Sequence, residues 1–380
     1  LLNESTKGHI KFKNATGEWK LPEPGMICDG LFSDFDNDGL PDLILAVEWG
    51  PITVLKNTGT EFQKVMDPVL DSNPGWWTSL TSGDIDNDGD IDYIVGNYGQ
   101  NTYFKCNSKE PITIYAKDFD QNGSLDPFIS CYWRDTNGIK REYFYHGRDE
   151  MIKQLLTIRR KFQTYTSYGL ATVDQVFSKK ELEGALILKA NNFNSVLARN
   201  DGKGHFLIEN LPREAQMAPL YGMQALDLND DEYLDLVISG NDYGMELIQG
   251  RADAMQGLVL LNDKQGDFIP LSFQRSGYFI SGDAKSLVSI HNPSGENIFL
   301  QMINLDSLAV HKTTHKTTLF YPNDNEYSGI MTFQHGLSRK IEFYSGTSYK
   351  SQSRAGISLS ARSTQLQVRN AISKSVRTIN

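Results

Sequence analysis

Acidic side chains recur at a fixed spacing in four short segments of the sequence, residues 34–42, 84–92, 118–126 and 227–235. We call these segments loops 1 to 4. Each has Asp or Asn at positions 1, 3, 5 and 9, and loops 1 to 3 have Gly at position 6. Alternate side chains converge on one point only where the backbone curls tightly, and Gly permits such a turn. Oxygen ligands in this number suit a hard divalent cation, and they suit Ca²⁺ better than Mg²⁺, which accepts fewer protein ligands.

The predicted ligands are the side chains at positions 1, 3, 5 and 9 and the carbonyl oxygen at position 7. They are Asp34, Asp36, Asp38, Leu40 and Asp42 in loop 1; Asp84, Asp86, Asp88, Asp90 and Asp92 in loop 2; Asp118, Asp120, Asn122, Ser124 and Asp126 in loop 3; and Asp227, Asn229, Asp231, Tyr233 and Asp235 in loop 4. Glu232 replaces Gly in loop 4, and a non-Gly residue in a left-handed conformation costs roughly 1 kcal/mol or more. We therefore predict calcium in loops 1 to 3 and a candidate fourth site in loop 4.

Two other interpretations of the loops are less consistent with the sequence. An EF-hand needs a Glu at position 12 and flanking helices, whereas position 12 is Leu45, Val95 or Ile129 in loops 1 to 3, inside apolar runs. In a solvated turn, carboxylates about 4 Å apart repel by about 1 kcal/mol per pair even in water. Such a turn has no reason to gather acidic residues repeatedly before a strand.

A second repeated element follows the loops, a hairpin of the form Leu-x-Asn-turn-Gly-x-Phe. It occurs at Val54–Phe62, Val196–Phe206 and Leu258–Phe268, with a further copy at Leu1–Phe12. Asn, Asp and Gly between two β-prone runs favour hairpin turns. Loop, strand and hairpin together form a unit of about 35–55 residues, the length of one four-stranded propeller blade. The repeats predict an all-β fold, a propeller of about six or seven blades, with Leu1–Phe12 pairing with the last blade to close the ring.

The chain divides into two predicted regions. Residues 1–312 are expected to form the propeller, with a helical insertion at 148–183 between the third and fourth blades, because apolar residues recur there at helical spacing. Residues 313–380 are expected to form the last blade and a C-terminal β segment. The helical insertion is interpreted as packing against the side of the ring.

Composition limits the classes of partner. The net charge of −10 argues against nucleic-acid binding. Four bound calcium ions would neutralise most of this charge. No apolar run approaches the ~18 residues of a membrane-spanning helix. Because calcium is abundant outside cells, we expect an extracellular or periplasmic protein.

The three cysteines, Cys28, Cys106 and Cys131, lack metal-site spacing and are interpreted as free thiols, with a Cys106–Cys131 disulfide as the alternative.

The loops and hairpins resemble the FG-GAP/VCBS repeats of integrin α-chain propellers and of many bacterial surface proteins, over about Leu1–Leu271. The segment Arg339–Ser353 (RKIEFYSGTSYKSQS) is similar to the ASPIC/UnbV-type segment that follows such propellers, and residues 147–169 (GRDEMIKQLLTIRRKFQTYTSYG) resemble large proteins of this type from Bacteroidetes. The resemblance implies an accessory protein at the cell surface, often an outer-membrane lipoprotein. Glu232 and the decayed later repeats depart from the family pattern.

No catalytic motif is found in the sequence, and we expect a non-enzymatic binding or scaffold module. Trp49, Trp76, Trp77 and Tyr98 fall near strand ends, where exposed rings could bind a ligand. The alternative is that these rings pack in the core. Two functions stay open: a subunit that docks to protein in a surface complex, and a lectin-like module that binds glycan. An enzyme, a polysaccharide lyase, is the less favoured third option, because some calcium propellers that this chain resembles are lyases.

Overall fold

The computed structural model describes residues 2–245, 249–292, 294–323, 325–343, 349–351, 356–370 and 374–379. Strands dominate this part of the chain and the helices are short, which confirms the predicted all-β class. Leu1 of the first hairpin copy lies outside the described residues, as do parts of the Arg339–Ser353 segment.

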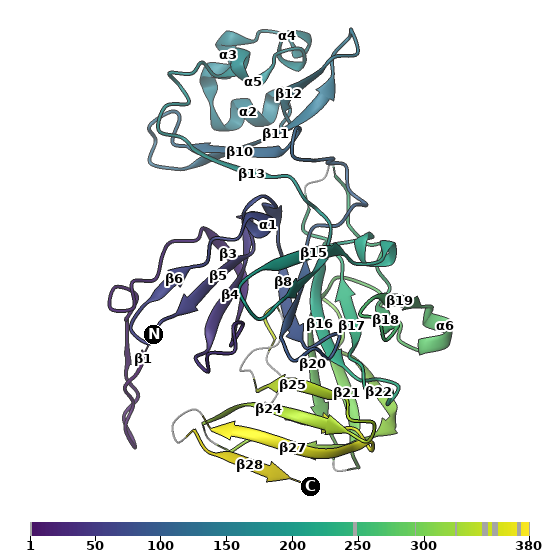
Figure 1. Cartoon of the computed structure of the whole chain (residues 1–380). Coiled ribbons are helices and arrows are strands. Elements are labelled where there is room, and N and C mark those ends of the chain that lie inside the picture. The colour runs from purple at the N-terminus through teal and green to yellow at the C-terminus, as the bar shows by residue number, and fades with distance from the viewer. Residues whose placement is uncertain are drawn as a thin grey trace.

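Four antiparallel sheets, which we call blades 1 to 4, stand in a row, and their first strands β3, β8, β16 and β20 contact one another in that order (Figure 1). The strands are β3 (Met26–Ser33), β4 (Asp42–Gly50), β5 (Thr53–Asn57) and β6 (Phe62–Lys64) in blade 1; β8 (Ser79–Gly83), β9 (Asp92–Gly96), β14 (Val196–Asn200) and β15 (Phe206–Asn210) in blade 2; β16 (Leu220–Leu226), β17 (Asp235–Gly240), β18 (Leu258–Asn262) and β19 (Phe268–Leu271) in blade 3; and β20 (Ala284–His291), β21 (Glu296–Ile303) and β22 (Ala309–Lys316) in blade 4. The short strand β7 (Gly75–Trp76) pairs with β4, and short helical turns α1 (Pro68–Asp71), η1 (Arg213–Gln216) and α6 (Phe273–Ser276) connect strands.

Blade 2 is interrupted in its middle. β9 pairs directly with β14, with Val95 opposite Val196, so residues 97–195 leave the blade after its second strand and return at its third. This inserted unit holds the sheet β12-β11-β10-β13 and helices α2 to α5, and Figure 1 shows it standing apart from the row of blades. Its elements are β10 (Ile112–Lys117), β11 (Asp126–Arg134), β12 (Lys140–Phe144), α2 (Arg148–Gln154), α3 (Leu156–Lys161), α4 (Tyr165–Gly169), α5 (Val173–Val176) and β13 (Leu186–Ala190).

The inserted unit corrects the predicted order of blades. Loop 3 connects β10 and β11, so it heads a sheet outside the row and not a third blade, and the helices lie within this unit and not between two blades. The hairpin at Val196–Phe206 completes the sheet that loop 2 begins. The predicted order was wrong because β9 pairs with β14, a strand about 100 residues further along the chain. The described residues therefore place four blades in the row, fewer than the predicted six or seven.

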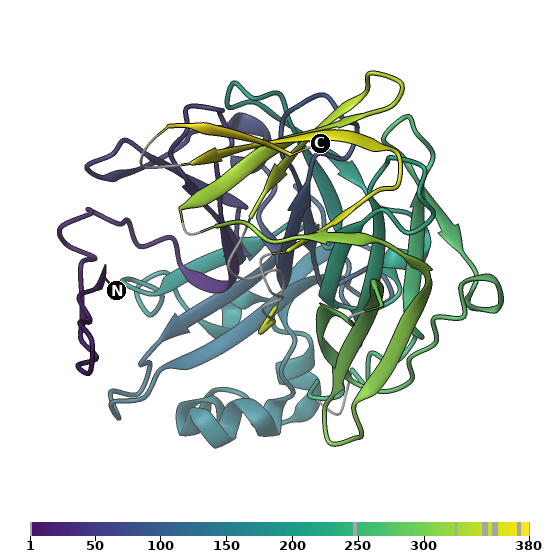
Figure 2. The same cartoon turned by 90° about the horizontal axis from the view of Figure 1, so that it is seen from below.

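The C-terminal strands form a separate sheet beneath the blades (Figures 1 and 2). Its order is β25-β24-β27-β28, and a two-stranded ribbon β23-β26 accompanies it. The strands are β23 (Thr318–Phe320), β24 (Glu326–Phe333), β25 (Ser338–Glu342), β26 (Ile357–Leu359), β27 (Ser363–Asn370) and β28 (Val376–Ile379). The boundary predicted after residue 312 falls inside β22.

The predicted ring closure by the first hairpin is wrong. β1 (Leu2–Asn3) pairs with β2 (Phe12–Lys13) in a two-stranded sheet of their own, and their residues are exposed. The turn chemistry of this segment therefore formed a local hairpin, but its side chains bury too little apolar surface to join a blade.

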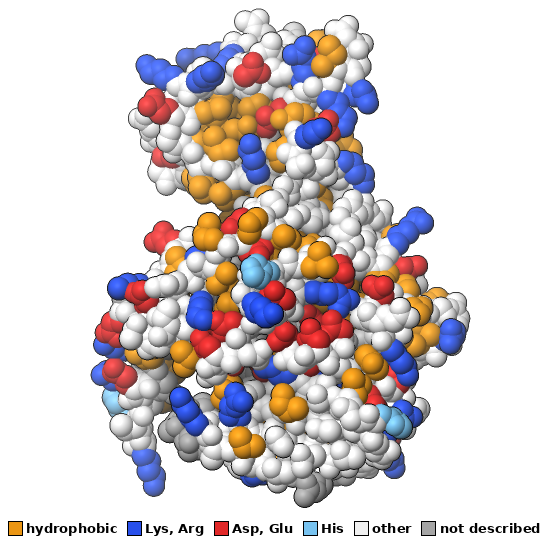
Figure 3. Space-filling model, in the orientation of Figure 1, with side chains coloured by type: hydrophobic (Ala, Val, Ile, Leu, Met, Phe, Trp, Pro, Cys, Tyr) orange, Lys and Arg blue, Asp and Glu red, His pale blue; other side chains and the backbone are white. Residues whose placement is uncertain are grey.

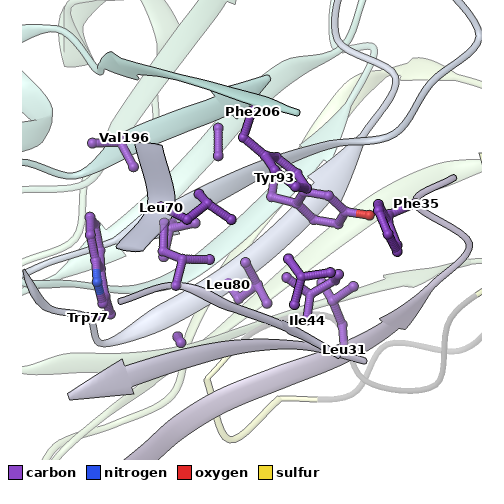
Figure 4. Packing of buried hydrophobic residues seen from close by; sticks show 14 of the residues in the cluster. Leu31, Phe35, Ile44, Leu70, Trp77, Leu80, Tyr93, Val196 and Phe206 are labelled. Atoms are coloured by element: carbon purple, nitrogen blue, oxygen red, sulfur yellow. The ribbon is translucent and has the colours of Figure 1, made fainter. Parts of the chain in front are cut away.

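The core between blades 1 and 2 ties the loops to the fold. Trp77 is fully buried at one end of this cluster, and Figure 4 shows Phe35 from loop 1 at the other end, near Tyr93 and Phe206. Burying a large side chain of this kind contributes about 1.5–3 kcal/mol. Position 2 is apolar in every loop, with Phe35, Ile85, Phe119 and Leu228 each in or against a hydrophobic cluster. Each loop is therefore anchored by its second residue.

Candidate metal centres

All four loops adopt one backbone conformation. Position 4 is left-handed in each, with φ between 59° and 61° at Asn37, Asn87, Gln121 and Asp230. Position 6 also has positive φ, at Gly39, Gly89, Gly123 and, in loop 4, at Glu232 with φ 76°. Loop 4 thus keeps the turn despite the strain of a non-Gly residue there, because Glu232 is buried and its surroundings fix it.

Two backbone hydrogen bonds recur in the loops and close each turn. The position-6 N–H donates to the position-1 carboxylate, as Gly39 does to Asp34 Oδ2 at 3.0 Å. The position-2 N–H donates to the position-9 carboxylate, as Phe35 does to Asp42 Oδ2 at 3.3 Å. The equivalent bonds are present in loops 2, 3 and 4. These bonds fix the acidic side chains at both ends of the loop.

A third bond orients position 5, whose side chain accepts from the N–H of position 7. Leu40 donates to Asp38 Oδ1 at 2.9 Å, and Asp90, Ser124 and Tyr233 make the same bond in their loops. The position-7 residues that were predicted to offer carbonyl oxygens are therefore held next to the position-5 side chains.

Carboxylate oxygens converge in three of the four loops. In each of the following sets, one oxygen per residue lies within 4.8 Å of the others: Asp34, Asp36 and Asp42; Asp84, Asp86 and Asp88; and Asp118, Asp120 and Asp126. Asp38 and Asp92 lie in the same loops but outside these sets. Loop 4 has an amide, Asn229, at position 3, and its carboxylates alone form no such set among the described residues. The three sets mark loops 1 to 3 as groups that could hold a metal ion, and the fourth site in loop 4 stays a prediction.

The residues of loops 1 and 2 fit a bound cation. Asp34 Oδ1 and Asp84 Oδ1 are buried and have no hydrogen-bond partner, although the other oxygen of each carboxylate accepts a backbone N–H. Such an orphaned carboxylate oxygen is costly unless a cation compensates it. In loops 3 and 4 both oxygens of the position-1 Asp accept backbone N–H groups. The demand for a cation is therefore greatest in loops 1 and 2.

Burial perturbs the acidic groups of loops 1, 2 and 4. It raises the pKa of Asp42, Asp84 and Asp235 to about 7 and that of Asp92 to about 8, mainly through desolvation of the charged form. Desolvation also raises the pKa of Asp34 to about 6, with Lys340 opposing the shift. These carboxylates are expensive to ionise without a counter-charge.

The hairpin Asn is a site residue that sequence reasoning assigned only to a turn. Asn57, Asn200 and Asn262 each donate a backbone N–H to the position-9 Asp of their own blade. Asn200 Nδ2 also donates to Phe35 O at 2.6 Å, and Asn262 Nδ2 donates to Ile85 O at 2.8 Å. In blades 2 and 3 the hairpin Asn side chain therefore holds the loop of the preceding blade, whereas Asn57 of blade 1 donates to Pro41 O in its own loop. The Asn that stands before the hairpin turn after every loop of the row was the available signal.

Neighbouring loops are also joined directly through position 4. Asn37 Nδ2 donates to Asp90 Oδ1 at 2.5 Å, and Asn87 Nδ2 donates to Glu232 O at 3.1 Å. Loops 1, 2 and 4 therefore lie side by side in one face, which we call the three-loop face. Figure 3 shows Asp and Glu side chains, with Lys and Arg among them, in a band between the blades and the C-terminal sheet. Loop 3 belongs to the inserted unit and lies away from this face.

Basic residues from the hairpins lie beside all three loops of the three-loop face, and in loop 4 this residue is Lys264, whose Nζ lies 3.4 Å from Asp231 Oδ2. Lys56 contacts Asp36 and Asp38 in loop 1, and Arg199 Nη1 lies 3.0 Å from Asp86 Oδ2 in loop 2. Both precede the hairpin Asn by one residue. The acidic partners raise the pKa of Lys56 through hydrogen bonding to Asp36. These cations were also missed by the sequence analysis, because they follow their loops by many residues.

The aromatic residues proposed as ligand-binding rings are mostly core. Three of the four rings are buried: Trp49, Trp77 and Tyr98. They therefore pack in the core, as the alternative interpretation predicted, and cannot serve as exposed platforms for a ligand. Trp76 is half-buried, with its ring centroid 4.7 Å from that of Trp49 and 4.5 Å from that of Tyr98. The joint between the blades and the inserted unit is filled by Trp49, Trp76, Tyr98 and Phe193, whereas Trp77 lies in the core between blades 1 and 2. The position of Trp49, Trp76 and Tyr98 near strand ends is explained by their packing in this joint.

The described cysteines are free. Desolvation raises the pKa of Cys28, Cys106 and Cys131 to about 12, so these thiols are not poised as nucleophiles or metal ligands. None of the helices in the described part of the chain combines the length and apolar composition that a membrane-spanning helix requires.

Comparison with protein families finds an FG-GAP-like repeat at residues 34–95. The match covers loops 1 and 2, the hairpin at Val54–Phe62 and the strands between the loops. It indicates a β-propeller-type interaction module. No curated protein shows a significant match to the chain.

Proposed function

We propose that this chain is a calcium-stabilised, non-enzymatic interaction module of an extracellular or cell-surface protein. Calcium would occupy loops 1, 2 and 3, held by the converging carboxylates, with loop 4 as the candidate fourth site. The observation that carries the proposal is the pair of buried, unpartnered oxygens on Asp34 and Asp84 inside sets of converging carboxylates. Calcium supplies the positive charge that makes those groups stable in the folded chain.

The location and the ASPIC/UnbV-like, outer-membrane character of the parent protein belong to the same proposal. Calcium is available at millimolar concentration outside cells, and sites built on such loops in extracellular modules are commonly weak enough to need it. An outer-membrane-associated lipoprotein acting in a surface complex is consistent with this chemistry and with the resemblance of residues 339–353.

A protein partner fits the surface better than a glycan does. The aromatic rings expected to stack on sugar are mostly buried, whereas large apolar side chains are exposed on the inserted unit, among them Leu125, Leu156, Leu186 and Ile187. Figure 3 shows hydrophobic side chains gathered on the visible face of that unit. Exposed apolar patches of this kind mark protein contacts more often than sugar sites.

Metal binding is tested on the whole chain. Equilibrium dialysis against calcium, followed by elemental analysis, should find about three ions, and saturating calcium should raise the melting temperature above that in a chelator. Ions that bind only the folded state stabilise it by about 2.7 kcal/mol at a concentration 100 times their Kd. Magnesium at the same concentration serves as the control. An identical melting curve with calcium and with chelator would refute the calcium proposal.

The interaction role has a separate test. Cross-linked partners should be captured by the calcium-loaded wild-type chain and lost in an Ile187→Asp variant, which changes an exposed side chain of the inserted unit. A glycan array probed with the same protein should show no binding. Strong, saturable binding to a glycan that Ile187→Asp leaves intact would favour the lectin-like function.

A further inference from the structure

One strand of the C-terminal sheet touches every loop of the three-loop face. The backbone N–H of Lys340 in β25 donates to Asp84 Oδ2 of loop 2 at 2.7 Å. Lys340 Nζ donates to Asp34 O at 2.7 Å and to Asn37 Oδ1 at 2.6 Å, both in loop 1. Arg339 Nη1 lies 3.4 Å from Glu232 O of loop 4. These contacts span more than 250 residues of sequence for loops 1 and 2.

The charged residues of β25 are buried in this contact. Arg339, Lys340 and Glu342 are only 4%, 6% and 8% exposed. Glu342 Oε1 accepts the N–H of Asp34 at 3.1 Å and lies 3.2 Å from Lys340 Nζ. Charged side chains are almost never buried without partners, because desolvation costs several kcal/mol per ion. The seating of β25 therefore depends on the loops keeping the shape and charge that satisfy these three residues.

Asp84 connects the strand to the metal position. Its Oδ2 accepts the N–H of Gly89 at 3.2 Å within loop 2 as well as that of Lys340, whereas its Oδ1 is buried without a partner. A cation at Oδ1 would keep the carboxylate ionised and fixed, which strengthens Oδ2 as the acceptor for Lys340. Arg339 interacts electrostatically with Asp84 as well as with the acidic residues Asp227, Asp231 and Glu232 of loop 4.

We propose that β25 is a calcium-responsive latch: cation binding in loops 1 and 2 and docking of the C-terminal sheet stabilise each other, whereas loop 3 takes no part. The inference rests on the proposed calcium sites. Because coupling free energies are reciprocal, removing the latch contacts must weaken calcium binding by the same factor by which calcium strengthens docking.

The latch also forms part of the wall of a pocket. A space of about 180 Å³ lies between the blades and the C-terminal sheet, lined on one side by residues such as Gln224 and His291 and on the other by Lys340, Glu342 and Ser358. Releasing β25 would remove one wall of this space and widen its opening. Calcium would thereby control access to the interior between the first strands of the blades.

Hydrogen exchange on the full chain tests the latch. In calcium, peptides covering β24 and β25 should exchange at least about fivefold more slowly than in chelator, the lower end of typical coupling. An Asp120→Ala variant, which removes a ligand of loop 3, should keep this calcium-dependent protection. A Lys340→Met variant, which keeps the backbone N–H, should shift the calcium midpoint for protection of loops 1 and 2 about fivefold upward and leave that of loop 3 unchanged.

The outcomes separate the latch from the calcium sites beneath it. Calcium-dependent protection of loops 1 and 2 with unchanged exchange in β25 would overturn the latch and leave the calcium sites standing. A Lys340→Met midpoint equal to that of the wild type would overturn it as well. No calcium-dependent protection in any loop would overturn the calcium proposal itself and the latch with it. The wild-type comparison needs no variant, so poor folding of Lys340→Met does not remove the test.

Discussion

Loop 2 and loop 3 share a nine-residue motif and a backbone conformation, yet they lie in opposite environments. Loop 2 is bracketed by Asn200 from its own hairpin, Asn262 from the next blade and Lys340 from the C-terminal sheet. Loop 3 is held by its own backbone bonds and by Phe119 packed against Phe177. The motif thus encodes a local turn, and the surrounding chain decides whether that turn is a joint of the fold or a peripheral site.

The largest expected contrast is in the response of the metal-free protein to pH. Because burial raises the pKa of Asp84 and Asp235 to about 7 and that of Asp92 to about 8, the folded state binds protons that the unfolded state, with pKa near 3.8, has lost. Stability should therefore fall steadily as pH rises from about 4 to about 8, with each group contributing in proportion to its shift.

The measurement is the melting temperature in metal-free buffer across this pH range, repeated in saturating calcium. Calcium binds the ionised carboxylates, so it should flatten the fall, and its stabilising effect should be greatest near pH 8. Asp92→Asn should remove part of the slope in metal-free buffer. A metal-free melting temperature that is level or rises between pH 5 and pH 8 would contradict the buried-carboxylate account of the three-loop face.

The next contrast compares the same substitution in the two loops. Asp84→Ala removes a fully buried carboxylate and leaves the N–H groups of Gly89 and Lys340 without an acceptor. The expected cost is about 3 kcal/mol in the free energy of unfolding. Asp118→Ala should cost less than about 1 kcal/mol, because the N–H groups that it frees, on Asn122 and Gly123, are exposed to water. Denaturant titration of both variants in chelator at about pH 5, where the raised pKa keeps Asp84 protonated and its burial therefore costs little, measures the difference. Equal losses would show that the two environments are equivalent.

The local chemistry of the loops could be predicted from sequence, whereas their neighbours could not. Ligand positions, the turn and the apolar second residue are encoded within nine residues, and the glycine rule failed only at Glu232, where burial enforces φ 76°. The insertion inside blade 2 was missed because residues 97–195 contain no sequence pattern that indicates the pairing of Val95 with Val196. The sequence gives no sign that Arg339 and Lys340 differ from other strand residues. Their burial depends on contacts with loops more than 100 residues away.

A smaller contrast lies among the hairpin residues. Asn200→Ala removes the donor to Phe35 O and Ile91 O at a buried position and should cost about 2 kcal/mol. Asn57→Ala removes a bond to Pro41 O within its own loop and should cost about 1 kcal/mol, because no preceding loop depends on it. Chemical denaturation of the two variants in calcium gives both values. A larger loss for Asn57→Ala would mean that the hydrogen bond from Asn200 to the preceding blade contributes no more stability than the bond of Asn57 within its own loop.

The smallest expected effect concerns the charge beside loop 1. Lys56 contacts Asp36 and Asp38, so its ammonium group opposes a bound divalent cation by repulsion while stabilising the empty loop. Lys56→Met should therefore tighten calcium binding at loop 1 by about threefold, equivalent to roughly 0.6 kcal/mol at this partly exposed position. Lys64→Met is the matched control, because it removes the same charge from a residue that pairs with Asp71, outside the loops. Calorimetric titration should show the gain only for Lys56→Met. A weaker site in that variant would mean that Lys56 orients the carboxylates for the metal, and loop 1 would then resemble the tightly bracketed loop 2 more than the self-contained loop 3.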